Sequence, residues 1–518
     1  MANRSSASFF KLINGNNCPV NSFTTTLKTP FYLVIAIGIL FLGFGSSCRK
    51  DELTEDPSDK LSFSNDSVYF DTVFTTLSSV TKRFRIYNPN DKRIKISSIR
   101  LAGGSSSLFR MNVDGVPGDV ITDVEIDAGD SIFVFAEVTI DPNNELNPFV
   151  VSDSILFETN GNEQKVLLVA YGRNADFYRP EEYPGNGFPP YSILPDDNTI
   201  WTNERPKVVI GYLVVDSAQT LTIEAGTQVY LYNNSGIWVY KQGTLIVNGT
   251  LQDSVVFQGV RKEEQYREEP GQWDRIWINQ GSSSNKINYA VIKNGNIGIQ
   301  AEDLLELGSA PQGALTLSNT RIRNMNAFGI YGVNYKIDGW NNVVSNCGAY
   351  TLALIRGGNY TFRHCTFANY WSGNVRSEPS VILSNAQTRP DNSIVVSPMN
   401  FLFLNGIVYG NLQSGNELLV DGLADVPFNW AFKNSLLKID NPDINTSDPL
   451  HFEAMRFNED PGFADVNNQN FKLTASSVAR NWGSSVFVNT PPVISEDING
   501  LSRLADEGPD AGAFEFVP

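Results

Sequence analysis

The chain has 518 residues, 41% of them hydrophobic and 18% charged, and a formal net charge of −17. Because phosphate binding needs a basic face, this charge argues against nucleic acid as a partner. The length predicts more than one domain, and four cysteines are too few for a disulfide framework to stabilise so large a protein.

The chain begins with an apolar run that predicts export. Phe31–Gly45 contains fifteen uncharged residues and follows Lys28. A membrane-spanning helix needs about 20 such residues, whereas the apolar part of a signal peptide needs about 7–15 and ends in small residues. The alternative, a buried core helix, is disfavoured by the polar, acidic stretch that follows. We therefore predict a signal peptide over residues 1–47.

The end of this run, GSSC, resembles a bacterial lipobox, in which the cysteine becomes the lipidated first residue; Gly45 stands where leucine is usual. This resemblance implies that Cys48 carries the lipid, and acyl chains contribute about 0.8 kcal/mol per buried CH₂. The basic-acidic residues Arg49–Glu52 are similar to the tag that directs lipoproteins to the outer face of the outer membrane. We expect a protein anchored in the outer membrane and facing the exterior, with a lipidated acidic spacer over residues 48–61.

Residues 62–175 alternate between short apolar runs and turn-forming stretches. In Val80–Asn88, for example, apolar and charged residues alternate, and NPNDK follows. Such spacing is typical of an antiparallel β-sandwich. The order of the runs resembles the immunoglobulin-like module that often precedes a larger domain in bacterial surface proteins. A segment rich in proline and tyrosine follows, and we expect a stiff linker over residues 176–199.

From residue 200 the sequence repeats an apolar residue two positions before an asparagine. The intervals between these asparagines are 30, 22, 23, 42 and 30 residues, which indicates a solenoid with a period near 22 and insertions. Asparagine tolerates the left-handed turn region, and stacked amides can bond to one another. We predict a structural ladder of Asn294, Asn324, Asn346, Asn369, Asn411 and Asn441.

Further stretches resemble right-handed parallel β-helix proteins of the bacterial surface. Leu221–Leu231 and Gly243–Gly259 look like opening coils, Pro270–Ile278 resembles a recurrent PGxW element, and Asp460–Phe516 resembles the closing segment. The resemblance implies an all-β fold: an immunoglobulin-like sandwich followed, over residues 200–518, by a right-handed β-helix of about 10–12 coils. We expect the tail, 483–517, to cover the end of the helix. The family includes lyases, hydrolases and non-catalytic adhesins, so the fold alone does not choose a function.

The sequence offers no recognisable catalytic set. The adjacent carboxylates Asp196 and Asp197 precede the coils, and neither His364 nor His451 is followed by glycine. No Cys/His spacing indicates zinc. We predict no catalytic residue, metal site or cofactor, with calcium kept as the alternative. Cys347 and Cys365 suit a disulfide in an oxidising compartment, but they fall at different positions of their coils, which favours free thiols.

Three excursions interrupt the coils, at 262–275, 302–312 and 372–392, and insertions at one corner would wall a groove. Aromatic faces suit sugar rings and arginine suits carboxylates, although each such residue also has a purely structural interpretation. The candidate ligand contacts are Tyr266, Arg267, Trp273, Arg275, Arg356, Arg363, His364, Tyr370, Trp371 and Arg376. We expect capture of a polysaccharide or another surface macromolecule along the flank; the alternatives are a polysaccharide lyase or hydrolase, and a purely structural role.

Overall fold

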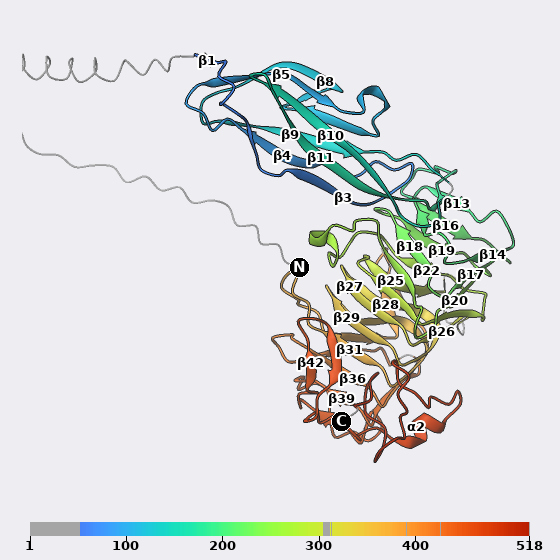
Figure 1. The fold of residues 1–518 in the computed structure, drawn as a ribbon. Coiled ribbons are helices and arrows are strands. Elements are labelled where there is room, and N and C mark those ends of the chain that lie inside the picture. Colours follow the sequence, from blue (N-terminus) through green and yellow to red (C-terminus); the bar gives the residue numbers. More distant parts are fainter. Residues whose placement is uncertain are drawn as a thin grey trace, which may run out of the picture.

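The computed structural model describes residues 52–143, 145–303, 311, 313–389, 391–424 and 426–516. The predicted signal peptide and Cys48 lie outside these residues. The described part of the predicted spacer is not free in solvent, because Leu53–Thr54 pairs with Arg93 and Ile94 in a sheet of the first body. The described chain is all-β, with a single short α-helix, α2 (Ser485–Asn489), and it forms two bodies (Figure 1). None of the helices in the described ranges is long and apolar enough to cross a membrane.

The first body consists of two sheets over one core. One sheet has the order β1-β5-β10-β11-β3, with β8 on β5, and the other has the order β2-β4-β9-β6-β7. In β4, Phe84 and Ile86 point into the core whereas Arg83 and Arg85 are exposed, as the alternating sequence predicts. The strands are β1 (Leu53–Thr54), β2 (Ser62–Phe63), β3 (Ser67–Phe74), β4 (Lys82–Tyr87), β5 (Arg93–Leu101), β6 (Phe109–Val113), β7 (Val116–Pro117), β8 (Val120–Ile126), β9 (Ser131–Val138), β10 (Phe149–Thr159) and β11 (Asn162–Arg173).

The second body consists of parallel strands in three ladders, and the chain visits the ladders in turn. We name each ladder by its first strand. The β12 ladder holds β12 (Asp176–Tyr178), β15 (Lys207–Val209), β18 (Gln228–Leu231), β21 (Val255–Gly259), β24 (Ala290–Lys293), β27 (Arg321–Met325), β29 (Val343–Cys347), β31 (Thr366–Asn369), β36 (Ile407–Gly410), β39 (Leu436–Leu437) and β41 (Arg456–Phe457).

The other two ladders share one large sheet, because β28 (Phe328–Trp340) and β30 (Leu352–Arg363) run through both. The β13 ladder begins with β13 (Tyr191–Ile193), β16 (Tyr212–Val215), β19 (Gly236–Val239), β22 (Ile276–Ile278) and β25 (Ile297–Glu302), and ends with β32 (Val381–Ser384) and β37 (Leu418–Asp421). The β14 ladder begins with β14 (Asn198–Trp201), β17 (Thr220–Glu224), β20 (Thr244–Asn248), β23 (Asn285–Asn288) and β26 (Ala314–Ser318), and ends with β35 (Met399–Leu404), β38 (Phe428–Lys433) and β40 (Phe452–Glu453).

Each strand therefore pairs in parallel with the strand one coil later, and like side chains stack. In the β13 ladder, Leu213, Ile237, Ile276 and Ile299 lie in register and are fully buried. Burial of such columns supplies the main stabilisation, at about 25 cal/mol per Å² of apolar surface. These large parallel sheets are consistent with a β-helix-like fold.

The segment expected to be a linker forms the first coil instead. Asp176–Tyr178 pairs with Lys207–Val209, and Tyr191–Ile193 pairs with Tyr212–Leu213–Val214. Its proline-rich composition suggested an extended connector, but strands are extended too, and here they find partners in the next coil.

The predicted asparagine row is in register only in part. Asn294, Asn324, Asn346 and Asn369 occupy equivalent positions in or directly after strands that pair in register, and the first three have positive φ. In the next coil, Gly410 pairs with Asn369, so Asn411 lies one position beyond the row. Asn441 is displaced further, because Val408 pairs with Leu437. The sequence repeat missed this shift because one-residue slips leave the apolar-to-asparagine spacing unchanged.

A second row of left-handed residues lies at the turn from the β14 ladder to the β12 ladder. Here amides do bond across coils: Asn319 donates to Asn288 (2.9 Å) and Asn341 donates to Asn319 (2.9 Å). Asparagine suits a left-handed turn because it pays little steric penalty there. The row comprises Tyr289, Asn319, Asn341, His364, Asn405 and Asn434, all with φ between 45° and 55°.

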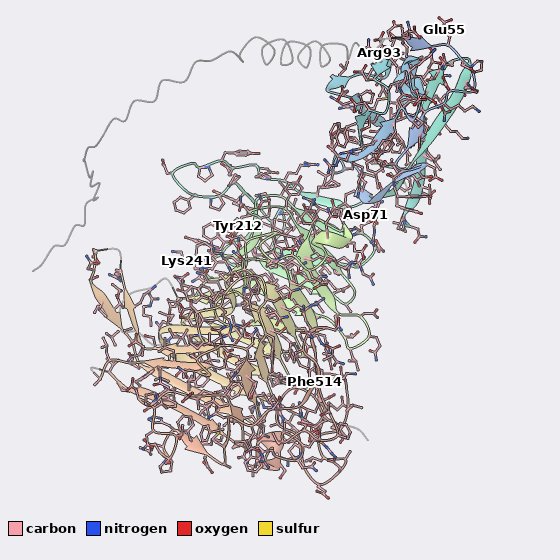
Figure 2. All side chains as sticks on the ribbon, turned by 90° about the vertical axis from the view of Figure 1, so that its left-hand side faces the viewer. Glu55, Asp71, Arg93, Tyr212, Lys241 and Phe514 are labelled. Carbon is pink, nitrogen blue, oxygen red and sulfur yellow. The ribbon has the colours of Figure 1, made fainter. Side chains whose placement is uncertain are left out.

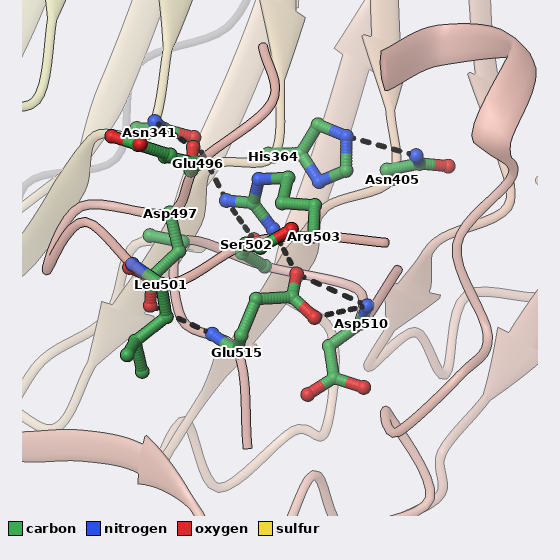
Figure 3. A network of polar contacts seen from close by, with 12 residues as sticks. Asn341, His364, Asn405, Glu496, Asp497, Leu501, Ser502, Arg503, Asp510 and Glu515 are labelled. Carbon is green, nitrogen blue, oxygen red and sulfur yellow. Dashed lines mark hydrogen bonds and ion pairs between the residues drawn. The ribbon is translucent and has the colours of Figure 1, made fainter. Parts of the chain in front are cut away.

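The C-terminal segment, residues 463–516, lies along the outer face of the β12 ladder rather than over the open end. Ile498 and Phe514 pack on Val343 and Ala368. Arg503, which is fully buried, forms an ion pair with Glu515 and donates to Asn341 (2.8 Å) (Figure 3). Polar groups buried this deeply need partners, and the left-handed row supplies one of them.

The two bodies meet at an aromatic contact. Phe74 from β3 packs edge-on against Tyr230 from β18, with ring centroids 4.8 Å apart. The Lys262 ammonium lies 4.2 Å and 4.3 Å from these two ring centroids. Burial, with a smaller contribution from the Arg173 cation, lowers the pKa of Lys262 to about 7.

Candidate functional site

The excursions do not line up at one corner. Residues 262–275 and 370–380 leave the turn from the β12 to the β13 ladder. The hairpin of β33 (Ala386–Thr388) and β34 (Ile394–Val396) leaves the turn from the β13 to the β14 ladder. Most of 302–312 lies outside the described residues. Consequently the excursions do not wall a single groove, and the ten candidate residues are spread over three corners.

The candidate aromatic residues near the β12 ladder are structural. Trp273 is fully buried and its Nε1 donates to the carbonyl of Lys293 (2.8 Å). Trp371 is 8% exposed and donates to Asn374 (2.8 Å). Tyr370 packs against Phe471, with ring centroids 6.1 Å apart, beneath the C-terminal segment. None of the three rings presents a free face to a ligand.

Two of the candidate cations have hydrogen-bond partners within the chain. Arg376 pairs with the buried carboxylate Glu417 (2.7 Å), which also accepts from Ser380. Arg363 donates from Nη1 to the carbonyls of Thr490 (2.7 Å) and Pro492 (3.1 Å), and so fixes the C-terminal segment. Both arginines satisfy local backbone or side-chain groups, which leaves little of their charge for a ligand.

His364 occupies the left-handed row, where other coils have asparagine. It is fully buried, and its Nε2 lies 3.0 Å from Nδ2 of Asn405, which makes this ring nitrogen the acceptor (Figure 3). Burial, helped by the nearby cations of Arg503 and Arg363, lowers the pKa of His364 well below its usual value. A neutral, enclosed imidazole of this kind serves the turn and is out of reach of a substrate.

The remaining four candidates are accessible. Tyr266 is stacked by Arg261, 3.9 Å from the ring centroid, and Arg267 beside it is exposed. Arg275 and Arg356 are partly exposed and belong to the β13 ladder and its edge. Of these four, Arg275 lies beside a set of aromatic residues that the sequence prediction does not include, because it donates to Gln300, which is in register with Trp277. This aromatic set forms the candidate site.

Two tryptophans stack on the outer face of the β13 ladder. Trp238 in β19 is in register with Trp277 in β22, and their rings are nearly parallel, 11° apart in plane and 4.9 Å between centroids. Tyr240 packs edge-on against Trp238 at 5.4 Å. All three rings are partly exposed, so the ladder carries an aromatic strip in contact with solvent.

Hydrogen bonds hold both indoles in place. Trp238 donates to Asn279 (2.7 Å), and Trp277 donates to Glu302 (3.1 Å). Gln300 pairs with Trp277 from the next coil and continues the same outward row. It also donates to Glu302 (2.6 Å). Fixed side chains lose little conformational entropy on binding, which favours recognition of a rigid ligand.

An ion pair lies beside this strip. Arg275 pairs with Asp274 (3.0 Å) and also donates to Gln300. Tyr212 donates to Asp274, and burial raises the pKa of this phenol. The arrangement offers flat apolar surfaces edged by amide, carboxylate and guanidinium groups, which is suited to binding polar rings.

The described carboxyls with a raised pKa lie away from the aromatic strip. A glycosidase requires a protonated carboxyl next to a second carboxylate. Burial raises the pKa of Asp510 and of Glu515, and both residues belong to the C-terminal segment. Within the described ranges, no group of three or more His, Cys, Asp or Glu residues could hold a metal ion. Cys347 and Cys365 are both buried and free.

Sequence reasoning missed the two tryptophans because they look like core residues. In GIWVY and RIWIN, each tryptophan is surrounded by apolar neighbours. The signal that could have found them is parity: the residues on either side of Trp238 and of Trp277 are fully buried, so in a strand each tryptophan must point outward.

The sequence matches no protein-family profile and no characterised protein. Parts of the chain resemble solved structures. The ASH/PapD-like domain 7 of human CEP192 is 16% identical over 24% of this chain and 92% of that one, with a TM-score of 0.17. A family 123 glycoside hydrolase from Clostridium perfringens, described for glycolipid glycan hydrolysis, is 9% identical over 22% of this chain and 25% of that one, with a TM-score of 0.16. Scores this low support no conclusion about the fold or function of this chain.

Proposed function

We propose that this protein is a surface lipoprotein that binds a polysaccharide along the outer face of the β13 ladder. In this proposal an immunoglobulin-like sandwich, held at the outer membrane through Cys48, carries a right-handed parallel β-helix. The two-sheet first body and the three parallel ladders support these domain assignments. The apolar run before Cys48 supports export and anchoring.

The observation that carries the proposed function is the stacked pair Trp238–Trp277. Two indoles are held side by side in contact with solvent, and aromatic faces bind the apolar faces of sugar rings. Of the other two outer faces, that of the β12 ladder is covered by the C-terminal segment from Arg321 onward.

The test is a glycan array probed with the full chain carrying Cys48→Ala, with and without calcium, while unsaturated product is monitored by absorbance. The proposal predicts binding without product. Product formation would instead favour the alternative, a polysaccharide lyase acting on the same flank. Absence of binding to any glycan would overturn the proposal and favour a structural role.

A further inference from the structure

The aromatic strip ends at a slot. The outward row of the β13 ladder runs Ile193, Val214, Trp238, Trp277 from one coil to the next. Trp277 covers one face of Trp238, whereas the coil on the other side contributes only the short side chain of Val214. A concave space opens there, between Trp238 and the loop that precedes β13.

The walls of this slot come from three coils and from the loop. Pro184 and Phe188 belong to the loop, which projects beyond the coils (Figure 2). Phe188 is 62% exposed, so its ring is accessible to a ligand in the slot. The lining residues are Pro184, Phe188, Tyr191, Ile193, Val214, Asp216, Trp238 and Tyr240.

The loop has a fixed, unusual backbone. Gly185, Asn186 and Gly187 all have positive φ, with values of 68°, 51° and 84°. Glycine adopts such values without strain, and asparagine tolerates them. The turn therefore directs Phe188 toward the slot through local backbone preferences.

We propose that this slot binds one neutral pyranose ring of the glycan, which continues the stack that Trp277 and Trp238 begin. This inference rests on the proposed function and names its ligand class. The walls are aromatic and aliphatic, which matches the apolar faces of a pyranose. Asp216 is the sole charged residue in the lining, and its carboxylate accepts hydroxyl donors but repels a uronate or a sulfate.

The test measures binding of neutral hexasaccharides (cellohexaose, mannohexaose and xylohexaose) and of hexagalacturonate by titration calorimetry and tryptophan fluorescence. We expect a neutral probe to bind and to perturb Trp238 fluorescence, and hexagalacturonate to bind at least tenfold more weakly. In Phe188→Ala, affinity for the neutral probe should fall about two- to tenfold, since an aromatic contact contributes about 0.5–1.5 kcal/mol.

Tyr183→Ala is the matched control, because Tyr183 belongs to the same loop and is 70% exposed but does not line the slot. Its affinity should equal that of the wild type. In Asp216→Asn, the preference for the neutral over the anionic probe should shrink.

Each contrary outcome is distinct. Glycan binding that is unchanged in Phe188→Ala would overturn the slot and leave the proposed function intact. Tighter binding of hexagalacturonate would overturn the ligand class. Failure of every glycan in the array as well as these probes would overturn the proposed function. Binding of N-acetyltryptophanamide, with no binding of any saccharide probe, would overturn the ligand class and identify the slot as a site for aromatic peptide side chains.

Discussion

The β12 and β13 ladders belong to the same coils, yet one outer face is covered by the chain and the other is in contact with solvent. The β12 ladder presents Val343, Ala368 and Tyr370 outward, and the C-terminal segment covers them. The β13 ladder presents Trp238 and Trp277 outward, and these remain in contact with solvent. An outward apolar residue in a repeated fold can therefore be assigned to packing or to ligand binding only once the chain elements that cover each flank are known.

Mutation of the covered flank should lower the free energy of unfolding more than mutation of the open flank. Arg503→Met leaves Glu515 buried without its cation, and removal of one partner of a buried pair costs about 3–5 kcal/mol. We expect this loss in the free energy of unfolding from urea denaturation. The double variant Arg503→Met/Glu515→Leu should recover most of it, because two apolar residues leave no unpaired charge. A loss of less than about 1 kcal/mol in the single variant would show that the segment is not held by this pair.

Mutation of the open flank should lower the glycan affinity rather than the free energy of unfolding. Trp277→Ala removes half of the indole stack, and we expect glycan affinity to fall tenfold or more, about 1.4 kcal/mol. Trp340→Ala, which removes a partly exposed tryptophan at the end of β28 on the β14 ladder, is the matched control and should retain affinity. Equal losses in both variants would place the binding surface elsewhere.

The junction between the two bodies should respond to pH. The pKa of Lys262 is lowered from 10.5 to about 7 in the folded chain, so between these pH values the unfolded chain binds the extra proton. The free energy of unfolding therefore gains a contribution that rises as pH increases from about 7 toward 10.5, and Lys262→Met removes it. In urea denaturation at several pH values, the free energy of unfolding of the wild type minus that of the variant should rise over this range. A difference independent of pH would contradict a buried, neutral lysine.

The smallest effect is expected in the left-handed row. His364→Asn places the residue type that occurs in neighbouring coils at a position with φ of 50°. We expect a change of about 1 kcal/mol in the free energy of unfolding, comparable to one hydrogen bond, and unchanged glycan binding. Loss of binding with retained stability would show instead that His364 contacts the ligand.

The sequence predicted the parallel stacking because the repeat and its alternation are local properties. The period near 22 led directly to Asn294, Asn324 and Asn346, which do lie in register with positive φ. It could not detect the one-residue shift at Asn411, since register depends on inter-strand pairing.

The candidate site was predicted less well, again for a physical reason. Of the predicted ligand contacts, Arg275 and Arg356 lie at the β13 ladder, whereas Trp371 and His364 are buried. The identity of an aromatic or basic residue does not distinguish one that packs in a core from one that faces a ligand. For His364, what separates the two cases is the path of residues 463–516, a long-range contact that no local pattern encodes.

Hydrogen–deuterium exchange of the full chain, with and without a glycan identified on the array, tests the central claim most directly. The account predicts slower exchange over Gly236–Val239 and Ile276–Ile278, with no change over residues 463–516. Protection confined to the C-terminal segment or to the first body would contradict it and would assign binding to another surface.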